Sequence, residues 1–356
     1  MQIHGGNILE VSRKYNISKN KIIDFSSNIN PLGFPEGVQN LLKRGINEII
    51  SYPDSDSTEL KEEIARWLGI NEKNILAGNG STELIYLIAR VLKPKCVLIP
   101  VPTFNEYERS LNCISSELRY LPLKEKKHFR FDISDIFLLL PQIDILYLCN
   151  PNNPTGVLYR KNEIISLVEG AEKRGVLVVI DEAFMDFTDN ESVIGEITRR
   201  ENLIVIKSLT KFFGIPGLRL GYLVSNSKMV DKICYYKEPW TVNVVAQKAG
   251  VACLKDGDFR LKTKRFIDRE RKYMLDKLSR LKGLKPYSSS TNYLLIKIVK
   301  SGLSSGRLYE MMAREGCLIR DCSSFRGMGN KFIRVAVKKR KQNNLLIENL
   351  KRIMEG

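Results

Sequence analysis

A lysine and an arginine stand eight positions apart in the mainly apolar stretch SLTKFFGIPGLRLGYL, residues 208–223. A lysine held among apolar groups and near a second cation has a lowered pKa, and its neutral amine can form a Schiff base with a carbonyl compound. Arg219 could supply the second cation and hold a phosphate through paired N–H groups. Taken alone, the stretch is equally compatible with a solvated Lys211 and a structural arginine.

Asp181 closes the apolar run VLVVI, residues 176–180. A carboxylate at that point is costly to remove from water unless it meets a cation or hydrogen-bond donors. Two interpretations remain open from these residues: Asp181 caps the next helix, or it holds a protonated ring nitrogen. Asn153, in the turn NPNNPTG, is on its own a turn residue.

The segment AGNGSTELIYLIA combines glycines with the start of a helix. Gly78 and Gly80 allow the backbone to approach a ligand closely, and Ser81 and Thr82 begin the helix. The free N–H groups and positive dipole end of a helix N-terminus suit a phosphate. The alternative is a glycine turn followed by a hydroxyl cap.

The elements that must position these side chains are short apolar strands alternating with helices. The alternation predicts a mainly parallel sheet covered by helices on both faces, in which ligands collect at the carboxyl ends of the strands. The polar residues above follow strand ends, so we expect them at one edge of the sheet. The predicted strands are 95–100, 143–149, 176–181, 203–208 and 218–224.

The chain divides into three parts by pattern. From about residue 245 the alternation gives way to a long charged helix, a strand and a terminal helix, which indicate a smaller α+β domain. We expect residues 1–45 to be an N-terminal segment that joins the small domain. Residues 46–244 then form the large, cofactor-binding domain, and residues 245–356 form the small one.

Composition narrows the class of protein. The 356 residues are 43% apolar, but no apolar run is long enough to predict a transmembrane helix, and the start of the chain lacks the pattern of a signal peptide. Seven scattered cysteines without a CxxC pair favour reduced thiols in the cytoplasm over disulfides. We expect no metal site.

The net charge of +17 is compatible with nucleic acid, an anionic membrane or anionic small molecules as partners. The basic clusters at 124–127 and 338–341 carry no interleaved aromatic residues, and no nucleic-acid motif accompanies them. We therefore interpret them as solvated surface and expect an anionic small molecule, with neither nucleic acid nor membrane as partner.

The order of these motifs resembles that of the pyridoxal 5'-phosphate (PLP) enzymes of the aspartate aminotransferase fold, fold type I. The resemblance implies a mainly parallel seven-stranded sheet sandwiched by helices, plus a smaller α+β domain. It makes Lys211 and Asp181 the catalytic residues: the lysine carries the cofactor as a Schiff base, and the carboxylate keeps the pyridinium nitrogen protonated. The protonated ring is then an electron sink.

The same resemblance implies the remaining cofactor contacts. Asn153 would donate to the ring 3'-oxygen. Phe104 would stack on the ring, with Tyr107 as a second candidate. Tyr52 resembles the tyrosine that reaches the phosphate in a partner subunit, which implies a homodimer with shared active sites. The implied phosphate ligands are Gly80, Ser81, Thr82, Ser208, Thr210 and Arg219.

The motifs HGGN (4–7) and NINPLG (28–33) narrow the reaction. Together with the cofactor motifs they resemble the L-threonine O-3-phosphate decarboxylases of cobalamin synthesis, which are related to histidinol-phosphate aminotransferases. The implied reaction is decarboxylation of L-threonine O-3-phosphate to (R)-1-aminopropan-2-yl phosphate, which supplies the linker of the cobalamin nucleotide loop. Arg334 would bind the substrate carboxylate and Arg320 its phosphate. Further substrate contacts are implied for His4, Gly5, Asn28 and Asn153.

Two alternatives stay open. The first is a histidinol-phosphate aminotransferase, against which the sequence DEAF (181–184) argues, because Phe184 lacks the tyrosine hydroxyl usual in such enzymes. The second is a basic binding protein that kept the fold without catalysis.

Overall fold

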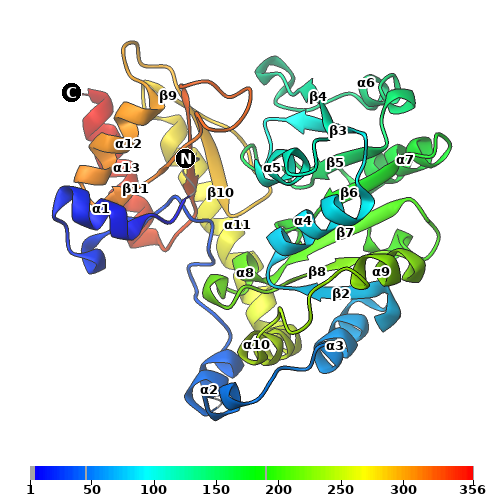
Figure 1. The fold of residues 1–356 in the computed structure, drawn as a ribbon. Coiled ribbons are helices and arrows are strands. Elements are labelled where there is room, and N and C mark those ends of the chain that lie inside the picture. The colour runs from blue at the N-terminus through cyan, green and yellow to red at the C-terminus, as the bar shows by residue number, and fades with distance from the viewer. Residues whose placement is uncertain (1–4, 45, 189–190, 356) are drawn as a thin grey trace.

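The computed structural model describes residues 5–44, 46–188 and 191–355. Its helices and strands are arranged around a seven-stranded sheet in the large domain and a four-stranded sheet in the small domain (Figure 1). A third sheet consists of two short strands. Within the described ranges, no helix combines the length and apolar character needed to cross a membrane.

The larger sheet has seven strands in the order β2-β8-β7-β6-β5-β3-β4. The pairs from β7 through β4 are all parallel, and only β8 runs antiparallel to its two neighbours. The predicted mainly parallel, seven-stranded sheet is therefore confirmed. Its strands are β2 (Ile75–Gly78), β3 (Cys96–Val101), β4 (Glu117–Pro122), β5 (Ile145–Cys149), β6 (Leu177–Asp181), β7 (Leu203–Ser208) and β8 (Gly221–Val224).

The predicted strand 218–224 is shorter than expected. A 3-10 turn, Pro216–Leu218, precedes it, and Arg219 has a left-handed backbone with φ of 59°. A left-handed residue cannot continue an extended strand, so β8 begins at Gly221. The guanidinium of Arg219 is consequently carried on a turn.

Helices cover both faces of this sheet because successive strand side chains alternate between the faces. Val97 and Ile99 pack into one apolar cluster with helices α4 (Ser81–Leu92), α5 (Glu106–Asn112) and α9 (Ser227–Cys234). Leu98 packs into the opposite cluster. The helices on that side include α3 (Thr58–Leu68), α6 (Ile133–Phe137), α7 (Lys161–Glu172) and α10 (Val244–Lys255).

The smaller sheet is antiparallel, in the order β12-β13-β10-β9. Helix α11 (Gly257–Ser279) runs from the large domain along this sheet (Figure 1). The strands are β9 (Leu284–Pro286), β10 (Tyr293–Ile298), β12 (Arg320–Asp321) and β13 (Phe332–Ala336). The other helices here are α12 (Ser305–Arg314) and α13 (Arg340–Glu355).

The N-terminal segment contacts the small domain through a parallel pair, β1 (Ile23–Asp24) with β11 (Cys317–Leu318). Helix α1 (Ile8–Tyr15) precedes this pair, and α2 (Glu36–Arg44) follows it. The boundaries 1–45, 46–244 and 245–356 stay a prediction. The 3-10 helices are Lys19–Lys21, Ile46–Ile50, Glu72–Asn74, Glu125–Lys127, Leu140–Gln142, Met185–Phe187, Ile194–Glu196 and Pro216–Leu218.

Candidate active site

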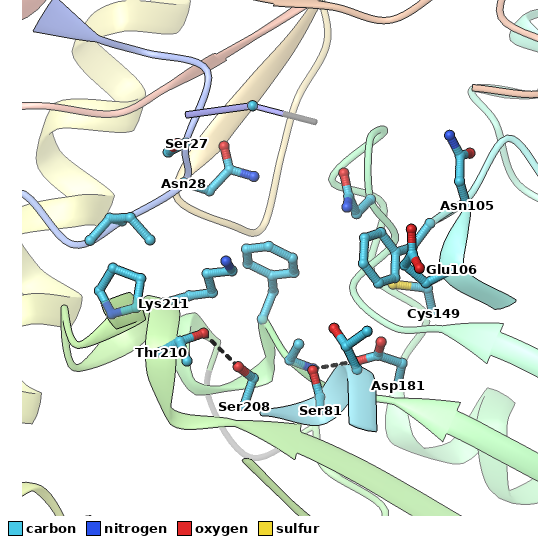
Figure 2. A pocket seen from close by; sticks show the side chains of 18 of the residues that line it. Ser27, Asn28, Ser81, Asn105, Glu106, Cys149, Asp181, Ser208, Thr210 and Lys211 are labelled. Atoms are coloured by element: carbon cyan, nitrogen blue, oxygen red, sulfur yellow. Dashed lines mark hydrogen bonds between the residues drawn. The ribbon is translucent and has the colours of Figure 1, made fainter. Parts of the chain in front are cut away.

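A cavity of about 530 Å³ lies where the strands of the large sheet end and the small domain begins. Cys149, Asp181 and Ser208 are the last residues of β5, β6 and β7, and all three line this cavity. Figure 2 shows Lys211 projecting into the space between these strand ends and Asn28 of the N-terminal segment. The cavity therefore draws on both domains and on the N-terminal segment.

Lys211 sits on the short helix α8 (Leu209–Phe212), directly after β7. Burial by protein atoms, together with the guanidiniums of Arg219 and Arg334, lowers the pKa of its amine to about 8. Near neutral pH a useful fraction of this amine is consequently uncharged and nucleophilic.

The backbone around Lys211 is held by the N-terminal segment. The backbone N–H of Asn30 donates to the Lys211 carbonyl at 3.1 Å, and the side-chain amide of Asn30 donates to the Phe212 carbonyl at 2.7 Å. Asn30 is almost completely buried. The motif NINPLG thus contacts the backbone that carries the nucleophile, a role that its sequence alone does not show.

Asp181 is buried at the end of β6. Its Oδ2 accepts a hydrogen bond from the Tyr107 hydroxyl at 2.7 Å, and its Oδ1 accepts from the Ala183 N–H at 2.9 Å. Burial raises the pKa of the carboxyl above its usual value, and the Tyr107 hydrogen bond opposes that shift. Asp181 is therefore a fixed carboxylate suited to a cationic partner in the cavity.

The expected phosphate ligands lie together at the start of α4 and the end of β7. Gly80 precedes α4 with φ of 80°, and a Cβ added there would stand 2.5 Å from Nη2 of Arg219. The guanidinium can lie over this position only because residue 80 has no side chain. The hydroxyls of Ser208 and Thr210 contact each other at 2.7 Å (Figure 2). Helix N-terminus, guanidinium and paired hydroxyls form an anion site.

Aromatic side chains form other walls of the cavity. Phe104 and Phe184 both line it. Phe184 packs edge-on against Tyr293, with ring centroids 5.1 Å apart. Tyr107, the second candidate for ring stacking, is completely buried and hydrogen-bonds Asp181 instead. Phe104 is consequently the better placed of the two candidates.

The small domain contributes two buried arginines on neighbouring strands. Arg334 of β13 is the register partner of Arg320 of β12. Arg334 donates to the side-chain oxygen of Asn153 and, at 2.9 Å, to the Ser26 carbonyl. Its Nε is buried without a hydrogen-bond partner in the described part of the chain. Arg320 donates to the Ser324 hydroxyl at 2.8 Å.

Both guanidiniums are in surroundings that disfavour their charge. Burial and the nearby Arg334 lower the pKa of Arg320 to about 10, and burial also lowers the pKa of Arg334. An anion bound between them would offset that cost.

The structure brings most of the predicted site residues to this one cavity. Those that line it are Gly5, Asn28, Ser81, Thr82, Phe104, Asn153, Asp181, Ser208, Thr210, Lys211, Arg219, Arg320 and Arg334. His4 lies outside the described residues. Tyr52 is 81% exposed, stacks near Trp240, and does not line the cavity of its own chain.

The cavity also includes residues that the sequence analysis missed. Ser26 and Ser27 line it, and Asp24 fixes both by accepting their backbone N–H groups. The signal was an Asp followed by serines after a short strand, a pattern typical of side-chain-stabilised turns. Glu106 lines the cavity as well, and its carboxylate accepts from Tyr86 and Arg109.

These groups meet the chemical needs of pyridoxal 5'-phosphate. Lys211 supplies an amine of lowered pKa for the aldehyde, Asp181 a fixed carboxylate for the ring nitrogen, and Gly80 with Arg219 a cradle for the phosphate. The donor set of the cavity therefore fits the cofactor that the motifs imply.

Comparison with known proteins gives a consistent family. A family model described as aminotransferase class I and II matches residues 20–350. The chain is 35% identical to the threonine-phosphate decarboxylase of Salmonella typhimurium, over 99% of this chain and 97% of that protein. It is 39% identical to a protein of Caldanaerobacter subterraneus that bears the same name provisionally, over 99% and 94% of the two chains.

Two solved structures share the fold at a similar level of identity. The L-threonine-O-3-phosphate decarboxylase from Porphyromonas gingivalis superimposes with a TM-score of 0.84 at 30% identity, over 93% of this chain and 98% of that one. The histidinol-phosphate aminotransferase from Clostridium acetobutylicum gives a TM-score of 0.87 at 32% identity, over 93% and 98%. The global fold therefore does not separate the two activities.

Proposed function

Because this chain belongs to the class I and II aminotransferase family, we propose that it is a pyridoxal 5'-phosphate-dependent enzyme that decarboxylates L-threonine O-3-phosphate. The product is (R)-1-aminopropan-2-yl phosphate, the linker precursor for cobalamin. The observation that carries the proposal is the convergence of Lys211, Asp181 and a pair of buried arginines on one cavity.

The two arginines match the two anionic groups of this substrate. Arg334 is fixed by Asn153 and Ser26 and keeps a buried Nε without a partner among the described residues, so it is suited to the carboxylate. Arg320 lies beside it across the β12–β13 ladder and is assigned the phosphate. Asn28 and Gly5 lie in the same wall and would add contacts to the phosphate.

Bound pyridoxal phosphate supplies an aldehyde that captures the substrate amine and a protonated ring that accepts the electron pair left when CO₂ departs. Asp181 holds the proton on the ring nitrogen. Lys211 Nζ takes up and returns protons next to the substrate α-carbon. Arg334 holds the carboxylate that is lost, and the aromatic walls exclude water. All of these side chains line the cavity, and two hydrogen bonds hold the Asp181 carboxylate in place.

Phe184 favours decarboxylation over transamination. It lines the cavity without a hydroxyl, so the cofactor lacks one hydrogen-bond donor that aminotransferases of this kind usually provide. Histidinol-phosphate aminotransferase is nevertheless the second candidate, because the structure from Clostridium acetobutylicum is equally similar.

We further propose a homodimer in which Tyr52 reaches the cofactor phosphate of the partner subunit. Tyr52 is highly exposed and its ring contacts that of Trp240, which is half exposed. Ile49 and Ile50, shortly before Tyr52 in the chain, are exposed as well. Exposed large apolar side chains grouped in this way are typical of a protein interface. The seven free thiols support a cytoplasmic location.

One assay separates the two activities. The purified protein is incubated with L-threonine O-3-phosphate, and separately with histidinol phosphate plus 2-oxoglutarate. We expect CO₂ release in the first reaction and no consumption of 2-oxoglutarate in the second. The reverse pattern would make the chain an aminotransferase. Absence of both, together with no visible absorbance from lysine-bound cofactor, would leave a binding protein that kept only the fold.

A further inference from the structure

Two tyrosines stack on each other, and one of them hydrogen-bonds Asp181. Tyr107 comes from α5 and Tyr147 from β5, and their ring centroids lie 5.3 Å apart at an interplanar angle of 26°. Both side chains are almost completely buried, and neither lines the cavity. Both rings therefore lie in the protein interior, outside the cavity lining.

Their hydroxyls differ in one respect. The Tyr107 hydroxyl donates to Asp181 Oδ2 at 2.7 Å. The Tyr147 hydroxyl is buried and finds no hydrogen-bond partner within the described ranges. Tyr147, whose hydroxyl has no partner among the described residues, can therefore serve as the control for Tyr107, whose hydroxyl is hydrogen-bonded.

We propose that Tyr107 is a positioning residue whose hydroxyl fixes the Asp181 carboxylate and thereby strengthens the binding of pyridoxal phosphate. The inference rests on the proposed function, since it assigns Asp181 to the ring nitrogen of that cofactor. Tyr107 itself does not touch the cofactor and acts only through Asp181.

The hydrogen bonds of Asp181 explain why one hydroxyl matters. Only two donors hold the carboxylate in the described structure: Tyr107 on Oδ2 and the Ala183 N–H on Oδ1. No described cation lies within ion-pair distance of Asp181. Lys207 and Lys211 act on it only over a longer range. Removing the Tyr107 hydroxyl would leave the buried carboxylate with a single donor.

Tyr107 is suited to be a permanent donor. Burial raises its pKa well above its usual value, so the phenol keeps its proton at neutral pH and below. An ionised carboxylate can only accept, so the direction of this hydrogen bond is fixed as long as Asp181 is charged. The bond stabilises the charged form of Asp181 that a protonated ring nitrogen requires.

The titratable groups around Asp181 come from five elements. Tyr107 lies on α5, Cys149 on β5 and Tyr293 on β10, while Lys207 and Lys211 come from β7 and α8. Burial raises the pKa of Cys149 to about 12, so this thiol stays neutral. Lys211, with a pKa of about 8, titrates near neutral pH, so changes well below neutral pH report on Asp181.

The test compares Tyr107→Phe with the matched variant Tyr147→Phe. Each apoenzyme is titrated with pyridoxal phosphate, and the dissociation constant is obtained from visible absorbance. We expect Tyr107→Phe to bind the cofactor about tenfold more weakly or worse, because it loses a hydrogen bond to a charged group. Tyr147→Phe should bind it as the wild type does. Equal affinity in all three proteins, or equal loss in both variants, would overturn the inference.

Two further readouts separate positioning from a general loss of structure. In Tyr107→Phe the loss of cofactor affinity on acidification should begin at a higher pH, because the Asp181 pKa rises when its donor is removed. In an Asp181→Asn background, Tyr107→Phe should have little additional effect. An unchanged pH profile or full additivity would contradict the proposal, even if Tyr107→Phe folds less well.

The same titration keeps the two hypotheses distinct. If the wild-type protein does not bind pyridoxal phosphate at all, the proposed function fails. If the wild-type protein binds it and Tyr107→Phe binds it equally well, the function stands and only the role of Tyr107 is wrong.

Discussion

Lys207 and Lys211 are four residues apart, but they lie in opposite electrostatic surroundings. Lys207 of β7 is buried and pairs with Asp186 at 2.6 Å and with Glu182 at 3.8 Å. Lys211 of α8 faces the cavity and has no ion pair in the described structure. Its cationic neighbours are Arg219 and Arg334, which help to lower its pKa to about 8.

The comparison shows what turns a buried lysine into a nucleophile. Lys207 forms ion pairs with two carboxylates and acts as a structural cation. Arginines beside Lys211 favour the neutral amine, which is the form that reacts with an aldehyde. Burial is common to both, so the sign of the neighbouring charges decides the role.

The largest effect is expected from Lys211→Ala. Without the amine no covalent bond to the cofactor can form, and decarboxylation should fall by at least about a thousandfold. The visible absorbance of lysine-bound cofactor should disappear, and borohydride should no longer fix pyridoxal phosphate to the chain. Peptide mass analysis after borohydride treatment of the wild type should place the modification at Lys211. A variant that keeps the absorbance would refute this assignment.

The corresponding change at the other lysine, Lys207→Met, should lower the free energy of unfolding. It should leave the covalent bond between Lys211 and the cofactor unaffected. Removing the cation leaves the buried Glu182 and the mostly buried Asp186 without their ion-pair partner, which typically costs about 3–5 kcal/mol of folding free energy. Urea unfolding of the apoenzyme measures the loss.

The folded fraction of Lys207→Met should still carry the cofactor on Lys211. Adding Asp186→Asn should restore part of the stability, because it removes one of the two unpaired charges. An unchanged free energy of unfolding in Lys207→Met would mean that the ion pairs are not structural.

The sequence predicts the residues that line this site better than it predicts the contacts that hold those residues in place. The sequence predicts that three side chains lie at one edge of the sheet, because each lies at or just after the end of an apolar strand and parallel strands end at a common edge. These are the side chains of Lys211, Asp181 and Asn153. The hydrogen bond from Tyr107 to Asp181 could not be predicted, because sequence does not fix which face of a short helix turns toward a strand end. Asn30 was missed because its contact with the Lys211 carbonyl joins distant parts of the chain.

Two further limits have different causes. The left-handed turn at Arg219 interrupts a stretch whose apolar pattern predicts a strand, because local backbone geometry overrides the pattern there. Tyr52 stays a prediction, because its expected contact involves a second copy of the chain.

A smaller effect is expected from Arg219→Gln, which removes one cation from the surroundings of Lys211. The pKa of the amine should move from about 8 toward its usual value of 10.5. Since only the neutral amine reacts, the pH midpoint for reaction with free pyridoxal should shift in the alkaline direction. Pyridoxal is the appropriate probe because it lacks the phosphate that Arg219 is expected to bind. The rate is followed by visible absorbance across the pH range.

The matched control for this experiment lies on the Lys207 side. Arg260 lines a separate cavity with Lys207 and stacks over Trp67 at 5.0 Å. Arg260→Gln should leave the midpoint at Lys211 unchanged. If both variants shift the midpoint equally, net charge rather than local contact sets the reactivity.

The smallest effect is expected from Phe184→Tyr, which adds one hydroxyl to the wall of the Lys211 cavity. A new donor favours the ionised form of a nearby cofactor oxygen, so the absorbance transition of the lysine-bound cofactor should move to lower pH. One hydrogen bond of about 0.5–1.5 kcal/mol corresponds to a shift of up to about one pH unit. A spectrophotometric pH titration of the holoenzyme measures it.

Phe187→Tyr is the corresponding change on the Lys207 side, where Phe187 packs against Phe212 at a centroid distance of 5.0 Å. It should alter thermal stability and leave the absorbance transition in place, since Phe187 does not line the cavity that holds Lys211. An equal shift in both variants would mean that the transition responds to packing around α8. A shift in Phe184→Tyr alone would show that a single donor in the wall of the Lys211 cavity tunes the cofactor.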